Sequence, residues 1–160
     1  MDAARSHLAP KANAPELHND QCSPQILALN SSRPFSNSLF TIRLWTGWHE
    51  AERPVVAPAL LYYEVTNALR RYVAQGELLP QEAAELLDVA LRLDIALYGD
   101  AELHRRALKL AEILSLPAAY DAHYLALAER MGAEFWTADK RLVRSVQEAM
   151  PWVRLLDGVK

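Results

Sequence analysis

The sequence predicts a single α/β domain with a mostly parallel central sheet that is covered by helices on both faces. Short apolar segments of strand length alternate with longer amphipathic segments along most of the 160 residues. Glycine and proline stand where these segments end. Half of the residues (51%) are apolar, which is enough for one sizeable core. Together these three observations favour one α/β domain.

Five strands are expected where apolar residues form short runs beside turn-forming residues. Residues 1–33 are rich in Pro, Asn, Ser and Ala, so this segment is expected to be irregular apart from the apolar run QILAL. The domain itself is expected to span residues 34–160. The predicted strands are residues 25–29, 54–58, 95–97, 134–137 and 152–156.

Six helices are expected between or before these strands. Gly76 and Gly132 are suitable stop residues, Pro80 suits the first position of a helix, and Asp100 is a suitable N-cap. The predicted helices are residues 37–52, 59–75, 80–93, 101–114, 121–131 and 139–150.

Charge and cysteine content exclude some classes of function. A net charge of -3 is not typical of a domain that binds nucleic acid through a broad basic face. It suits a protein with a basic partner, or an enzyme that reaches phosphates through metal ions. The single cysteine, Cys22, cannot form an internal disulfide and has no Cys or His neighbours at zinc-ligand spacing. A zinc site or a redox motif is therefore not expected.

No apolar run approaches the length of about 18 residues that a membrane span requires. The first residues also lack the charged and then apolar pattern of a secretion signal. We therefore expect a soluble, cytoplasmic protein.

Three carboxylates stand beside apolar segments that would hold them in place. Asp139 follows the strand at 134–137, Asp121 falls in the first turn of a helix, and Glu64 lies about one turn into its helix. Ligands of parallel sheets bind at the carboxyl ends of the strands, where these residues are expected. Taken singly, each has an ordinary explanation as a helix cap, a residue favoured by the helix dipole, or a surface partner of Arg71.

The segments around these carboxylates resemble the PIN-domain family, and within it the VapC-type toxin ribonucleases of toxin–antitoxin pairs. PALLYYEVTNAL around Glu64 is similar to the segment of the family's helix glutamate, and YDAHYLALA around Asp121 to its third acidic motif. WTADKRL around Asp139 is similar to its T-x-D motif. The resemblance extends from about Pro54 to the end of the chain.

The resemblance implies a PIN-like three-layer α/β/α fold and cleavage of RNA that depends on Mg2+ or Mn2+. It assigns Glu64, Asp121 and Asp139 as metal ligands, with Asn67 and Thr137 orienting ligands or waters. Oxygen ligands of this kind suit a hard divalent cation, and a bound cation can activate water for attack at phosphorus. An antitoxin protein is the protein partner it implies. The Leu- and Tyr-rich helix at residues 60–72, with the helices after it, is a candidate surface for an antitoxin or for a second copy of the chain.

Members of this family also have an aspartate at the end of their first strand, and this chain has no clean counterpart. Asp20 is acidic but follows a poor strand, whereas Asn30 follows the apolar run but is an amide. Either the site is degenerate, or the N-terminal segment does not represent the ancestral domain. A PIN-like module that binds a partner without cutting RNA is therefore the alternative function. A phospho-acceptor receiver domain fits poorly, because its acidic pair, acceptor aspartate and lysine are not found in order.

Overall fold

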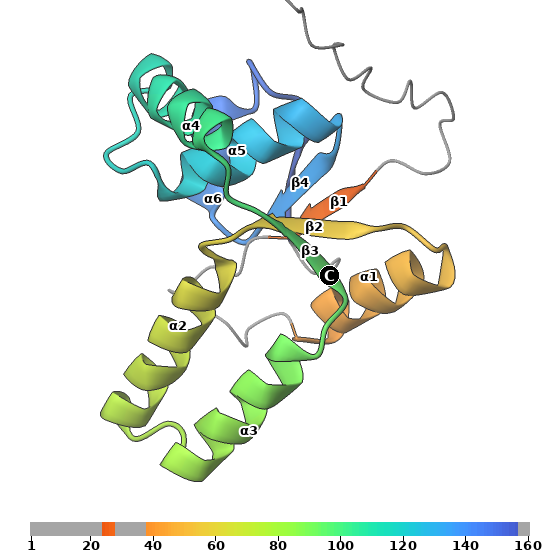
Figure 1. The fold of residues 1–160 in the computed structure, drawn as a ribbon, viewed down its shortest axis with the longest axis vertical. Helices are drawn as coiled ribbons and strands as arrows, with labels where there is room; N and C mark the ends of the chain where they lie inside the picture. The colour runs from red at the N-terminus through yellow and green to blue at the C-terminus, as the bar shows by residue number, and fades with distance from the viewer. Residues whose placement is uncertain (1–23, 28–37, 157–160) are drawn as a thin grey trace, which may run out of the picture.

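The computed structural model describes residues 24–27 and 38–156, with side chains described at 24–26 and 43–156. Eleven elements follow one another in these ranges, in the order β1–α1–β2–α2–α3–β3–α4–α5–β4–α6–β5 (Figure 1). The strands are β1 (Gln25–Leu27), β2 (Val55–Pro58), β3 (Ile95–Tyr98), β4 (Glu134–Thr137) and β5 (Val153–Leu155).

The five strands form one sheet in the order β3-β2-β1-β4-β5, and all neighbouring strands are parallel. The short strand β1 lies at the centre, where Ile26 is paired with Val56 of β2 and Phe135 of β4. Strands β2 and β3 follow β1 on one side of it, and β4 and β5 lie on its other side. Open parallel sheets bind their ligands at such a switch point, beyond the carboxyl ends of the strands. The predicted parallel sheet is confirmed.

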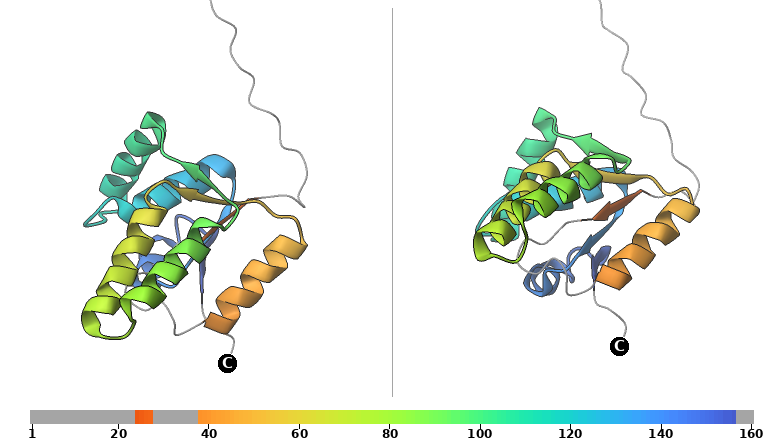
Figure 2. Two further views of the ribbon diagram at one scale, coloured as in Figure 1. Left: turned by 60° about the horizontal axis from the view of Figure 1, so that its bottom comes forward. Right: turned by 90° about the horizontal axis from the view of Figure 1, so that it is seen from below.

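Helices cover both faces of the sheet. Figure 1 shows α4 and α5 on one side of the sheet and α1, α2 and α3 on the other, and the left-hand view of Figure 2 shows the same division. The α/β/α layering expected from the sequence is therefore confirmed. The helices are α1 (Ser38–Glu50), α2 (Leu61–Gln75), α3 (Pro80–Leu91), α4 (Ala101–Ile113), α5 (Tyr120–Met131) and α6 (Lys140–Val146).

Helix α5 is the most deeply buried helix that the structure describes. It packs against β1, β2, β4 and α4, and its buried residues are Ala122, Tyr124, Leu125, Ala126, Leu127 and Ala128. The three alanines allow the helix backbone to approach its neighbours closely. By contrast, α3 has no fully buried residue. None of the described helices is both long enough and apolar enough to cross a membrane.

The predicted stop and start signals act as expected. Gly76 and Gly132 end α2 and α5 in the left-handed conformation, with φ of 74° and 60°. Pro80 opens α3. The Asp100 carboxylate caps α4 by accepting hydrogen bonds from the backbone N–H groups of Glu102 and Leu103.

Where the described residues test them, the predicted bounds agree with the structure to within two residues, except at the end of the last helix. The last helix ends at Val146 instead of residue 150, and residues 147–149 form turns. Met150 still donates its backbone N–H to the Val146 carbonyl and is buried before β5 begins, and the next residue, Pro151, has no N–H with which to continue such bonds. The strand predicted at 25–29 is described for Gln25–Leu27 and the helix predicted at 37–52 for Ser38–Glu50, and Ala28, Leu29 and Asn37 lie outside the described residues.

Replacing Asp100 with alanine is expected to lower the thermal midpoint of unfolding. The carboxylate caps α4 and also accepts a 2.8 Å hydrogen bond from Arg130 of α5, and these contacts lower the pKa of Asp100 to about 2. Because its pKa is lowered from 3.8, the contribution is present above that value and is lost as pH falls toward 2. Circular dichroism melts at several pH values test this.

Asp100→Asn should lower the thermal midpoint less than Asp100→Ala does, because an amide oxygen can still cap the helix. The control is Asp88→Ala, which replaces an exposed carboxylate inside α3. Equal midpoints for Asp100→Ala and the control would contradict the assignment.

Candidate metal-binding active site

The three predicted carboxylates all lie at the carboxyl edge of the sheet. Strand β2 ends at Pro58, and Glu64 falls in the first turn of the helix that follows it. Asp121 is in the first turn of α5. Asp139 stands two residues after β4 as the N-cap of α6. The fold thus brings residues from three separate segments of the chain to one edge.

A tyrosine fixes the position of Glu64. The Tyr124 hydroxyl of α5 donates a 2.6 Å hydrogen bond to Oε2 of Glu64. Only 1% of Tyr124 is exposed, and its ring stacks on Phe135 of β4 at 5.7 Å with an interplanar angle of 17°. Since the ring is fixed by packing, the hydroxyl and the carboxylate it holds are fixed as well.

Burial and mutual repulsion disfavour the charged forms of two carboxylates. Burial raises the pKa of Glu64, the hydrogen bond from Tyr124 lowers it, and the charge of Asp121 raises it further. Burial also raises the pKa of Asp121, and the charge of Asp139 adds to this effect. The charge of Asp121 thus interacts with those of both Glu64 and Asp139. A cation bound among the three carboxylates would relieve this repulsion.

Asp139 is held by its own turn. Its Oδ1 accepts hydrogen bonds from the backbone N–H groups of Arg141 and Leu142, and its own N–H donates to Oγ1 of Thr137. Thr137 is 2% exposed and ends β4. The threonine therefore positions the turn, and the second oxygen of Asp139 is the one that remains for a ligand.

A cleft of about 670 Å³ runs along α2 beside Glu64. Asn67 lies one helical turn after Glu64 in this cleft, and the guanidinium groups of Arg70 and Arg71 follow. The sequence-based stripe of Glu64, Asn67 and Arg71 is therefore found on one cleft-facing side of the helix. The full lining is Leu60, Tyr63, Glu64, Asn67, Arg70, Arg71, Ala74 and Tyr120.

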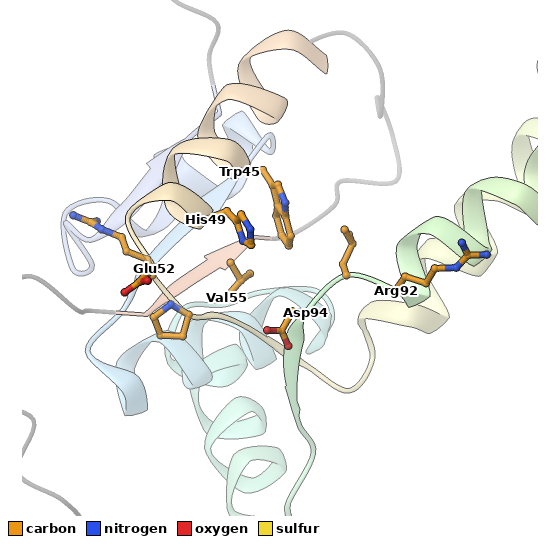
Figure 3. A pocket seen from close by; sticks show the side chains of 9 residues that line it. Trp45, His49, Glu52, Val55, Arg92 and Asp94 are labelled. Carbon is orange, nitrogen blue, oxygen red and sulfur yellow. The ribbon is translucent and has the colours of Figure 1, made fainter.

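A second cavity, of about 560 Å³, lies where β2 and β3 begin. Figure 3 shows Trp45 and His49 of α1 facing this cavity, with Asp94 on its other side. None of the three predicted carboxylates lines it. It opens at the amino ends of these strands, so it is separate from the carboxylate edge.

The donor set fits a hard divalent cation in its chemistry. Glu64, Asp121 and Asp139 offer only oxygen atoms, which Mg2+ and Mn2+ prefer, and the raised pKa values show that their charges are close enough to interact. In the described part of the chain, however, no three His, Cys, Asp or Glu side chains converge tightly enough to enclose an ion. The site is therefore an acidic edge with fixed side chains, not a closed cage.

The first acidic position of the family pattern is not placed. Asp20 and Asn30 both lie outside the described residues. Strand β1, which would lead to Asn30, does occupy the centre of the sheet. The expectation of a fourth oxygen ligand near this strand stays a prediction.

Sequence reasoning missed the role of Tyr124. The signal was present, because a tyrosine on an otherwise apolar helix face needs a partner for its hydroxyl. The partner is on another helix, so it could not be identified from the local pattern alone. Glu64 was recognised as a ligand candidate, but not as the acceptor that satisfies Tyr124.

Comparisons with known proteins bear on this geometry. The family model described as PIN domain matches residues 43–147, more than half of the chain. A solved structure described as a toxin–antitoxin complex from Klebsiella pneumoniae is similar at a TM-score of 0.48, with 16% identity. The match covers 84% of this chain and 99% of that one. No curated protein matches the sequence.

Replacing Tyr124 with phenylalanine should destabilise the protein by about 1 to 3 kcal/mol, because it leaves a half-buried carboxylate without its donor. It should also raise the pKa of Glu64, since the lost hydrogen bond lowers that pKa. Urea unfolding and an NMR titration of Glu64 measure the two effects. The matched control is Tyr62→Phe, whose hydroxyl makes only a 3.4 Å contact with the Ala90 carbonyl. Equal losses in both variants would show that the Tyr124–Glu64 bond adds no stability.

Replacing Asp121 with asparagine is expected to raise the stability of the metal-free protein at neutral pH. The raised pKa of Asp121 means that its charged form is less favourable in the folded state. The gain should shrink as pH falls toward 3.8, the ordinary value, because the wild-type carboxyl becomes protonated. Urea unfolding in EDTA measures it, and a variant less stable than wild type at neutral pH would contradict the repulsion described above. Adding Mg2+ should stabilise the wild type more than Asp121→Asn.

Proposed function

Because the chain belongs to the PIN domain family, we propose that it is a ribonuclease that requires Mg2+ or Mn2+. The observation that supports this most directly is the edge formed by Glu64, Asp121 and Asp139. Their positions match the family's acidic motifs, and their repulsion favours a bound cation. Hydrolysis of phosphodiester bonds is the reaction that such an edge serves.

The protein's own residues contribute positioning and charge. Glu64, Asp121 and Asp139 would hold the cation, which supplies an activated water and stabilises negative charge at phosphorus. Tyr124 keeps Glu64 in one orientation, and Thr137 keeps the turn of Asp139 in place. Neither residue needs to contact the RNA, so both act as positioning residues.

The cleft along α2 suits a strand of RNA. Arg70 and Arg71 lie in the same cleft as Glu64 and would contact phosphates further along the strand from the scissile bond. Asn67 lies between them and Glu64 along the helix, where its amide can orient a ligand or a water. This local basic group explains how a chain with a net charge of -3 can still hold RNA.

We further propose that the chain is the toxin of a VapBC-like pair in the cytoplasm, and that an antitoxin is its regulator. The motifs around Glu64, Asp121 and Asp139 support the assignment to this branch of the family. Helix α3 and its flanks offer a partner an apolar surface, which we call the α3 surface. Its exposed members are Leu79, Leu86, Val89, Leu91 and Leu93. A second copy of the chain is the other candidate for this surface.

The alternative function is a PIN-like module that binds its partner without cutting RNA. The observation that favours it is the lack of a clean first aspartate, since Asp20 and Asn30 each satisfy only half of the pattern. If Asp20 supplies the missing ligand, Asp20→Asn should lower cleavage as strongly as loss of another carboxylate does.

Cleavage of labelled total RNA tests the main proposal. Purified wild-type protein should cut RNA in Mg2+ or Mn2+ and should not cut it in EDTA. Glu64→Gln, Asp121→Asn and Asp139→Asn should each slow cutting by about 100-fold or more, because even residues that only orient metal ligands cost about 10- to 100-fold. These amides keep the local hydrogen bonds: glutamine can still accept from Tyr124, and asparagine still caps α6.

The matched control is Asp94→Asn, whose carboxylate lines the separate cavity at the amino ends of the strands. It should cut like wild type. If neither wild type nor the control cuts RNA in either metal, the non-catalytic alternative replaces the proposal. Cutting that survives in all three amide variants would mean that the activity comes from a contaminant or from another site.

A further inference from the structure

Two exposed tyrosines lie directly beside two of the proposed ligand residues. Tyr63 precedes Glu64 in α2, and Tyr120 precedes Asp121 at the start of α5. Their side chains are 79% and 66% exposed, and both line the cleft along α2. Two segments that are far apart in sequence therefore place aromatic rings in one cleft.

Rings exposed at a cleft indicate a ligand that covers them. Burying an aromatic side chain removes a large apolar area from water, so two rings left open beside a cleft favour an incoming flat, apolar group. The flat group must also tolerate the polar surroundings, because Asn67, Arg70 and Arg71 line the same cleft. A nucleic acid strand combines flat bases with phosphates and meets both requirements.

We infer that Tyr63 and Tyr120 form a stacking site for unpaired bases of the RNA strand. The inference rests on the proposed ribonuclease function for its choice of ligand, an RNA strand, and the guanidinium groups of Arg70 and Arg71 in the same cleft would hold phosphates of that strand without a cation. Both rings line the cleft that also contains Glu64, so the stacked bases would lie close to the scissile bond. Arg70 lies two helical turns from Tyr63, about 10 Å along the helix axis, where it meets a more distant phosphate.

This site would select unpaired RNA over a duplex. A paired strand keeps its base faces inside the stack and presents mainly phosphates and riboses. Only a strand with splayed bases can use the tyrosine rings, and stacking of this kind tolerates any base. The rings would therefore set a preference for single-stranded segments without setting a base sequence.

A protein partner is the competing occupant of the tyrosine rings. The guanidinium groups beside the rings favour phosphate-bearing ligands, whereas the aliphatic residues that suit a protein partner lie on the α3 surface. The two kinds of residue are thus on different parts of the molecule, and the cleft is the one that suits RNA.

Fluorescence polarisation with a labelled, unstructured RNA of about 12 nucleotides tests the inference. Binding is measured in EDTA on protein that carries Asp121→Asn, which prevents cutting and removes one charge that would repel phosphate. In this background Tyr63→Ala and Tyr120→Ala should each weaken binding about fivefold or more, the loss typical of one base–aromatic stack. Tyr63→Phe and Tyr120→Phe should bind like the parent, because the ring is retained.

The control substitution is Leu108→Ala, which removes a side chain that is 69% exposed on α4 and leaves the cleft intact. It should not change binding. A control strand with abasic sites should bind the parent more weakly and show no further loss with the alanine variants. Alanine variants that bind the normal strand like the parent, or a parent that does not bind it, would overturn the inference.

Cleavage assays run in parallel on otherwise wild-type protein separate this inference from the proposed function. Tyrosine-dependent binding without metal-dependent cutting would leave the stacking site standing and remove the ribonuclease. If cutting depends on metal but binding depends on neither tyrosine, the ribonuclease stands and the stacking site is ruled out. Because both rings are exposed, the thermal midpoints of the alanine variants should match wild type, which confirms that they fold.

Discussion

The burial of α5 against the centre of the sheet is the constraint on which the rest of the structure depends. Small side chains such as Ala122 and Ala126 let this helix approach β1, β2 and β4 closely. Two polar groups are fixed as a consequence. Asp121, in the first turn, is held at the carboxyl edge, and Tyr124 can satisfy its hydroxyl only by donating to Glu64 of α2. A core-packing requirement thus determines where two of the three carboxylates stand.

The same arrangement makes the proposed site unfavourable when no cation is bound. Burial and neighbouring charge raise the pKa of Glu64 and Asp121, so each ionised carboxylate is less stable here than in water. The hydrogen bond from Tyr124 offsets part of this for Glu64. For Asp121, both burial and the charge of Asp139 act in the same direction. A cation bound at this edge would offset both effects.

Sequence patterns predicted the elements well where a local signal exists. Gly76, Gly132, Pro80 and Asp100 mark helix ends through backbone conformation or capping, and these effects act within a few residues. The end of α6 was misplaced because the apolar period continues to Met150, although the helix ends at Val146 and turns follow it. The acidic edge was found through its motifs. The Tyr124–Glu64 bond was missed because it joins two helices far apart in the chain, and no local pattern reports such a contact.

The distribution of exposed side chains separates two surfaces with different chemistry. The cleft along α2 combines carboxylate, guanidinium and phenol groups, whereas the α3 surface is aliphatic, and α3 has no fully buried residue. Helix α3 packs against α2, so a partner that moved α3 would act on the helix that presents Glu64. Regulation of the proposed nuclease would then act through the α2–α3 pair, and the partner would not need to enter the cleft.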